Sequence, residues 1–192
     1  MTSVQQQSVR RAHAAMSPQG SAVTDPLRAS RLALPLAAAG LVLVGLLTYG
    51  FVLRLPLFHD DPPQLRRLWS MDYADIWWRD RQFTYYRPLP ATLMKILSEA
   101  QGRFDPVTLH ALGLGLHLLA AVLLLLLANR NRPPRPLYAL GAALLFMLYP
   151  FSYQAVAWVT AMVHPLVTVL LLGTLLALQG AYEGRRCLWA PA

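Results

Sequence analysis

Charged residues are scarce in this sequence, and acidic residues are the scarcest. Only 14% of the 192 residues are charged, with 9 Asp and Glu against 17 Lys and Arg, whereas a soluble domain usually carries about 25% charged residues. No acidic residue occurs between residues 32 and 53 or between residues 106 and 182. The composition therefore indicates a membrane protein. The lack of acids within its apolar segments disfavours a transporter that depends on such acids.

Cysteine is nearly absent as well. The single Cys187 excludes an internal disulfide framework and a metal site built from cysteines. The basic residues behind the formal net charge of +8 are distributed among separate segments beside apolar runs. This distribution fits membrane topology better than nucleic-acid binding, so we expect no nucleic-acid partner.

Long apolar runs define the organisation of the chain. Residues 32–53 contain no charge and can cross a bilayer core, which needs about 20 helical residues. Further spans are predicted over residues 107–128, 137–151 and 163–182. The third span is short and meets Pro150, so we expect it to tilt or to continue in broken form through residues 153–163. The predicted fold is an all-α polytopic membrane helix bundle of about four transmembrane helices, with a helical outer loop over residues 54–106.

The basic residues favour one side of the membrane. Residues 1–31 have the composition of a disordered tail and carry four basic residues, the turn at 129–136 carries three, and the end at 183–192 carries two. The loop over residues 54–106 is nearly charge-balanced. By the positive-inside rule, we expect the tail, the turn and the end in the cytoplasm and the loop outside.

Aromatic residues recur with helical spacing in the predicted outer loop. Trp69, Tyr73, Ile76 and Trp77 would share one apolar face of a helix. Such a face is typical of a helix that lies in the membrane interface. Aromatic residues that pack the loop together would give the same pattern, and the two interpretations are compatible.

The candidate chemistry lies at Phe58-His59-Asp60-Asp61, just after the first span. Two neighbouring carboxylates can bind a hard divalent cation, and one of them can act as a general base if its environment raises its pKa. His59 is a candidate third ligand or proton acceptor. The alternative is a solvated turn followed by a helix that starts at Pro63.

Basic and imidazole groups accompany these acids. Arg87 precedes Pro88, which favours an extended backbone, and its guanidinium suits bidentate contact with a phosphate; contact with lipid headgroups is the alternative. His110 and His117 lie two helical turns apart on one face of the second span. His110 is expected near the outer end and His117 is expected to be a packing residue. His164 lies at the outer start of the last span.

Four motifs in order resemble a known family. They are Phe58-His59-Asp60-Asp61, Tyr86-Arg87-Pro88-Leu89, His110-x6-His117, and the run from Leu144 to Pro150 that leads into residues 154–159. The sequence resembles the N-terminal part of a GT-C type polytopic membrane glycosyltransferase. The likeness is to bacterial relatives of the protein O-mannosyltransferases and of the tetratricopeptide-containing O-mannosyltransferases.

This resemblance implies transfer of a sugar from a polyprenyl-phosphate carrier to an acceptor on the outer face of a bacterial plasma (inner) membrane. Asp60 or Asp61 would be the base, or would hold a divalent metal (Mg or Mn) with His59. Arg87, His110 and His164 would bind substrate phosphate, and membrane lipid would be a partner.

The sequence also departs from the family pattern. Relatives tend to have Glu where this chain has Gln154, and an Arg followed by an acid near Met162 and His164. The missing Arg would weaken the donor site unless His164 substitutes for it. The family has at least seven spans, and about four are predicted here, so we expect a fragment or a truncated product. The alternative functions are a non-catalytic membrane assembly or scaffold protein and an inactive truncated enzyme.

Overall fold

The computed structural model describes residues 32–79, 86–130 and 135–188, and within these ranges the chain forms helices and no strand. Helix α2 (Ala33–Tyr49) continues into the 3-10 helix η1 (Gly50–Arg54), α5 covers Pro106–Asn129, and α8 covers Val163–Leu188. The predicted disordered tail and the last residues of the predicted cytoplasmic end lie outside the described residues.

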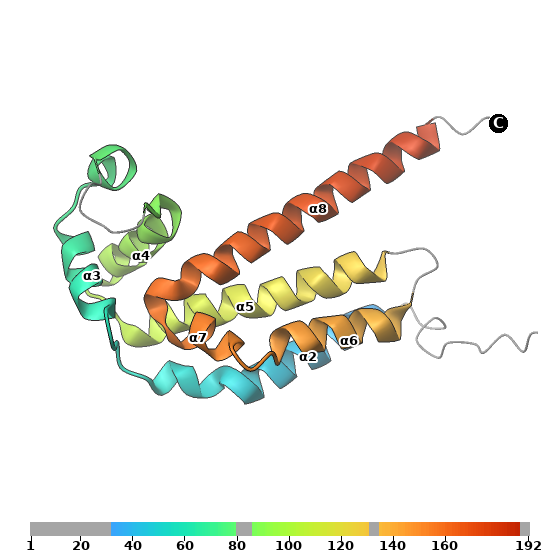
Figure 1. The fold of residues 1–192 in the computed structure, drawn as a ribbon, viewed down its shortest axis with the longest axis horizontal. Coiled ribbons are helices and arrows are strands. Elements are labelled where there is room, and N and C mark those ends of the chain that lie inside the picture. The colour runs from blue at the N-terminus through green and yellow to red at the C-terminus, as the bar shows by residue number, and fades with distance from the viewer. Residues whose placement is uncertain (1–31, 80–85, 131–134, 189–192) are drawn as a thin grey trace, which may run out of the picture.

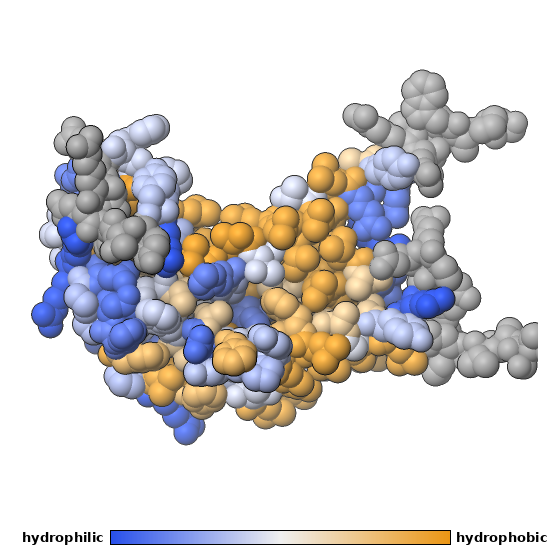
Figure 2. Space-filling view, in the orientation of Figure 1, coloured by the Kyte–Doolittle hydropathy of each residue, from blue (hydrophilic) through white to orange (hydrophobic). Residues whose placement is uncertain are grey.

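Three helical segments of the described chain are long and apolar enough to cross a membrane. They are Ala33–Arg54, Pro106–Asn129 and Val159–Glu183. Each contains or matches a predicted span, so the first, second and fourth spans are confirmed as apolar helices of sufficient length. These features indicate a multi-pass membrane protein. Figure 2 shows hydrophobic surface over the body of the bundle and hydrophilic surface at the end that carries α3 and α4.

The predicted third span, 137–151, is wrong in length. Helix α6 covers Pro136–Met147, and its 12 residues reach only about 18 Å at about 1.5 Å per residue, whereas the bilayer core is about 30 Å thick. The chain then turns and forms α7 (Ser152–Ala157) and the 3-10 helix η3 (Val159–Met162), which leads into α8. This is the broken continuation that the sequence allowed.

Side chains from other elements satisfy the carbonyls at the end of α6. The Tyr49 hydroxyl donates to the Met147 carbonyl at 2.7 Å, and Nε2 of His117 lies 3.2 Å from the same oxygen. The Ser152 hydroxyl donates to the Phe146 carbonyl at 3.2 Å. A helix can break at membrane depth only where its freed backbone groups find such partners. These contacts therefore explain how α6 can end where it does.

Helix α5 lies at the centre of the bundle and contacts α2, α6 and α8 (Figure 1). The core between α2, α5 and α6 includes Leu41, Leu118, Ala143 and Met147, all buried. Gly45 on α2 permits this close approach, because a Cβ there would collide with Leu118 and lie 2.8 Å from the Met147 sulfur.

The predicted outer loop is helical and forms a lobe at one end of the bundle (Figure 1). The lobe contains α3 (Asp61–Trp69), the π-helix η2 (Asp75–Arg79) and α4 (Pro88–Gln101). A single helix through Trp69, Tyr73, Ile76 and Trp77 was the wrong prediction, because α3 ends at Trp69 and a turn intervenes. Ile76 is 2% exposed and joins a small core with Leu65 and Met94, whereas the three aromatic residues of the pattern are 40–44% exposed.

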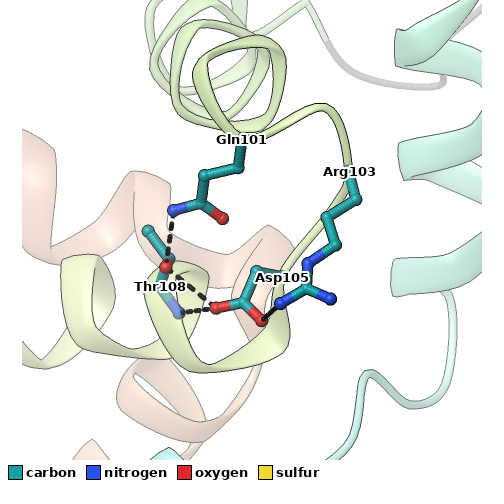
Figure 3. A network of polar contacts seen from close by, with 4 residues as sticks. All are labelled: Gln101, Arg103, Asp105 and Thr108. Atoms are coloured by element: carbon teal, nitrogen blue, oxygen red, sulfur yellow. Dashed lines mark hydrogen bonds and ion pairs between the residues drawn. The ribbon is translucent and has the colours of Figure 1, made fainter.

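A polar network fixes the lobe to the start of α5 (Figure 3). Asp105 is the N-cap of α5, and its Oδ2 accepts hydrogen bonds from the Thr108 backbone N–H at 3.0 Å and hydroxyl at 2.9 Å. Gln101 on α4 donates to the Thr108 hydroxyl at 2.8 Å, and Arg103 lies 3.4 Å from Asp105 Oδ1. The network orients α4 relative to the central helix.

Candidate functional site

A cavity of about 360 Å³ lies between the lobe and the segment that joins α7 to α8. Its walls come from α3, α4, η3 and the start of α8. Three predicted site residues line it: Asp60, Arg87 and His164. The structure thus brings together groups that are separated by up to 104 residues in the sequence.

The Asp60 carboxylate is held by three donors. Its Oδ1 accepts hydrogen bonds from the Trp158 indole N–H at 2.6 Å and from the Thr160 hydroxyl at 3.3 Å. Its Oδ2 accepts a hydrogen bond from the Gln64 amide, one helical turn further along the chain. A carboxylate has about four lone-pair sites, so Oδ2 keeps one that a proton can occupy.

The neighbouring Asp61 is fully buried, with a relative exposure of 0%. Its Oδ1 accepts a hydrogen bond from the Thr160 backbone N–H at 2.9 Å, and its Oδ2 is buried without a partner among the described residues. Burial raises the pKa of the Asp61 carboxyl, and the hydrogen bond from the Thr160 N–H opposes this rise. Helix α3 begins at Asp61, so the alternative of a solvated turn with a helix start at Pro63 is wrong.

His59 makes the turn that positions the two aspartates. Its backbone φ is 58°, in the left-handed region that residues other than glycine seldom adopt. The side chain is exposed, and its ring centroid lies 5.3 Å from that of Trp158. His59 therefore covers the indole that bonds to Asp60 and does not line the cavity.

The proposed metal ligands do not fit a divalent cation in this arrangement. The N–H and O–H groups of Trp158, Thr160 and Gln64 already occupy three of the roughly four lone-pair sites of Asp60, so little of that carboxylate is left for a cation. In the described part of the chain, no group of three or more His, Cys, Asp or Glu side chains could hold a metal ion. The set of His59, Asp60 and Asp61 is therefore not supported as a metal site by these contacts.

Two arginines border the same cavity as Asp60. Arg87 precedes the first residue of α4 and has φ −139° and ψ 64°, outside the helical region as expected for a residue before proline. Arg67, on α3, was missed by sequence reasoning because it reads as an ordinary polar position of an amphipathic helix. Arg67, Arg87 and the exposed His164 all line the cavity, so basic residues and the Asp60 carboxylate share it.

The two histidines of the second span do not line the cavity. His110 is fully buried. His117 lies deeper in the bundle, where its ring stacks on Phe146 with centroids 5.3 Å apart and contacts Tyr49 edge-on at 5.4 Å. The prediction that His117 is a packing residue is confirmed. The cavity gives no support to a phosphate-binding role for His110.

Three further site residues escaped sequence reasoning. Trp158 and Thr160 bond to Asp60 from 98 and 100 residues away, and no local pattern predicts such a contact. Gln64 could have been found, because it lies four residues after Asp60 at the start of a helix.

Comparison of the chain with family models, curated proteins and solved structures finds no match. The residues of the cavity are therefore the evidence for function.

Proposed function

We propose that this chain forms the site of a membrane glycosyltransferase that transfers a sugar from a polyprenyl-phosphate-linked donor to an acceptor hydroxyl. One observation carries the proposal: an oriented carboxylate, Asp60, shares a cavity with Arg67 and Arg87 at the lobe end of the apolar helices. The sequence motifs that resemble GT-C enzymes include two of these three residues.

The cavity residues suit the two halves of such a reaction. Asp60 accepts the proton of the acceptor hydroxyl while that oxygen bonds to the anomeric carbon of the sugar. The bond between the anomeric carbon and the phosphate oxygen breaks, and its electron pair stays on the phosphate. Arg67 and Arg87 stabilise this developing negative charge, because planar guanidinium groups match phosphate oxygens in charge and shape. His164 supplies a further nitrogen at the cavity wall.

We place the protein in a bacterial plasma membrane with its N terminus in the cytoplasm and residues 54–106 outside. The lobe lies at one end of the bundle and the C-terminal end of α8 at the other (Figure 1). The basic residue Arg130 lies at the end of α5 that is remote from the lobe, as the positive-inside rule requires for a cytoplasmic turn. A site at the outer surface gives a lipid-linked donor direct access from the bilayer.

The test is sugar transfer in membranes that contain the full chain. Undecaprenyl-phosphate-linked [14C]mannose is the donor probe, and label in the protein fraction is counted. Asp60→Asn keeps the size of the side chain and removes the base, so we expect transfer to fall by about 100-fold or more, as for loss of a general base. Asp72→Asn is the matched control, because Asp72 is an exposed acid of the same lobe outside the cavity. Full transfer by Asp60→Asn would refute the proposal.

A membrane assembly protein is the second candidate. Large apolar side chains on α8 remain 50–62% exposed in the isolated chain: Val167, Leu170, Leu171 and Leu178. Such a face suits contact with helices of another protein as well as with lipid. This candidate predicts a stable membrane complex that survives Asp60→Asn and an absence of sugar transfer in the unmodified protein.

A further inference from the structure

The chain between the end of α6 and the end of α7 lies beside the central helix α5 (Figure 1). The Met147 carbonyl at the end of α6 lies 3.2 Å from His117 Nε2, near the middle of α5. The Val156 carbonyl of α7 lies 3.5 Å from the position that a Cβ on Gly113 would take. At about 1.5 Å per residue, Gly113 and His117 lie about 10–17 Å from the lobe end of α5. The α6–α7 segment, residues 147–156, therefore passes the half of α5 that is nearer the lobe.

An undeformed bilayer would place this segment inside its hydrocarbon core. Helix α5 has 24 residues, and residues 107–128 contain no Lys, Arg, Asp or Glu. Its length is about 36 Å at about 1.5 Å per residue, so a centred core of about 30 Å leaves about 3 Å of helix outside at each end. The α6–α7 segment would then lie about 7–14 Å below the lobe-side boundary of the core.

Polar groups and irregular backbone are exposed along this segment. The exposed fractions are 57% for Tyr149, 63% for Phe151 and 49% for Tyr153, and Gln154 is exposed as well. Residues 148–151 are not helical. Lipid-exposed irregular backbone does not occur within the hydrocarbon region, whereas Tyr is enriched where a membrane meets water. The segment therefore has the character of a membrane–water interface at the depth of acyl chains.

Two neighbouring helices expose apolar side chains at the same level. The Tyr49 hydroxyl bonds to the Met147 carbonyl, so this turn of α2 is level with the end of α6. In that turn Leu47 is 78% exposed, and Leu119, two residues beyond His117 on α5, is 45% exposed. These surfaces suit acyl chains, so the polar surroundings that the α6–α7 segment requires are local to it.

We propose that the lobe-side leaflet is thinned beside the α6–α7 segment, so that lipid headgroups and water reach the side chains from Tyr149 to Gln154. A membrane matches a short apolar helix by local thinning, and α6 has only 12 residues. A tyrosine hydroxyl and a glutamine amide each donate and accept hydrogen bonds, which headgroups and water can satisfy and acyl chains cannot.

The thinning rests only on the placement of the bundle across a membrane. Its consequence for the reaction rests on the proposed function. Trp158, four residues beyond Gln154, lines the cavity, so a thinned leaflet would bring a lipid-linked phosphate closer to the cavity wall.

Spin-label accessibility in lipid nanodiscs tests the thinning without any substrate. The full chain carries Cys187→Ser, and a nitroxide is attached at Tyr153→Cys or, as the matched control at the same level, at Leu47→Cys. Power-saturation electron paramagnetic resonance measures collisions of the nitroxide with a nickel chelate, which stays in water and headgroups, and with oxygen, which concentrates among acyl chains. We expect nickel collisions to be several-fold more frequent at position 153 than at position 47, where oxygen collisions should prevail.

Three results would overturn the proposal. Frequent oxygen and rare nickel collisions at both positions would place the α6–α7 segment among acyl chains. Rare collisions with both reagents at position 153 would show that another protein surface covers the segment. Equal nickel collisions at both positions would show that the contact with water is not local. If Tyr153→Cys does not fold, Gln154→Cys on the same exposed segment gives the same readout. Sugar transfer plays no part in the measurement, so the thinning and the proposed reaction can fail independently.

Discussion

The Met147 carbonyl at the end of α6 provides the sharpest prediction about how this fold is held together. Two side chains donate to it, the Tyr49 hydroxyl at 2.7 Å and the His117 ring at 3.2 Å. Both are buried, with exposures of 5% and 3%. Because the acceptor is a carbonyl, Nε2 of His117 must carry the hydrogen. Either donor alone therefore still satisfies the carbonyl after the other is removed.

The expected energies follow from this redundancy. Tyr49→Phe and His117→Phe each keep an aromatic ring and remove one donor, so each should destabilise the fold by about 0.5–1.5 kcal/mol, with about 0.6 typical of membrane proteins. The double variant also leaves a buried carbonyl without its side-chain donors, which adds about 1–3 kcal/mol. We therefore expect the double variant to lose more stability than the two single variants combined.

The free energy of unfolding is measured for the wild type, the two single variants and the double variant. Each protein is denatured in mixed micelles and followed by far-ultraviolet circular dichroism. The control pair combines Tyr49→Phe with Thr174→Val, because Thr174 bonds to the Leu170 carbonyl within α8 and has no part in this contact. That pair should be additive within about 0.5 kcal/mol. Additivity of Tyr49→Phe and His117→Phe to the same tolerance would refute the shared-acceptor explanation for the end of α6.

Two other predictions concern stability. Gly45→Ala should destabilise the bundle by about 1–3 kcal/mol through overpacking, because its Cβ would lie 2.8 Å from the Met147 sulfur. The control is Gly40→Ala on the same helix, whose Cβ meets no atom within 4 Å. In the same denaturation assay the control should be neutral or stabilising. An equal loss in both variants would contradict the close approach of α2. Hydrogen bonds from Thr108, with a smaller effect of the Arg103 charge, lower the pKa of Asp105. The stability that they confer is present above the ordinary Asp pKa of about 4 and is lost as the pH falls through the lower pKa of the folded state. Asp105→Asn, which keeps a capping side chain, should show a smaller fall in Tm on acidification than the wild type, and parallel melting curves would refute this.

The sequence predicted those features that depend on local pattern. Uninterrupted apolar length identified the three long helices, and the apolar run that meets Pro150 indicated a broken third segment. The gathering of Asp60, Arg87 and His164 was inferred only from their expected positions near one membrane surface, yet all three line the cavity.

The features that sequence reasoning missed depend on contacts between distant elements. The end of α6 is set by Tyr49, 98 residues away from the carbonyl that it caps. The aromatic pattern from Trp69 to Trp77 imitates one helical face, but a turn after Trp69 breaks it. Asp61 was expected with Asp60 near the outer membrane surface. Its complete burial accompanies the packing of α3 against α4 and η3, which no local pattern predicts. Helical periodicity carries no information about such contacts.

The break after α6 and the cavity are two consequences of one event in the chain. If α6 continued as a helix from Met147 to Trp158, Trp158 would lie about 16 Å beyond Met147 along the helix axis, at about 1.5 Å per residue. Instead the chain turns after Met147, α7 packs on α5, and Trp158 and Thr160 reach the Asp60 carboxylate. The donors that satisfy Met147 therefore stabilise the geometry of the site as well as the bundle. Loss of both donors should disturb the Trp158 indole resonance even though neither Tyr49 nor His117 lines the cavity, and an unchanged resonance in a folded double variant would show that the two features are independent.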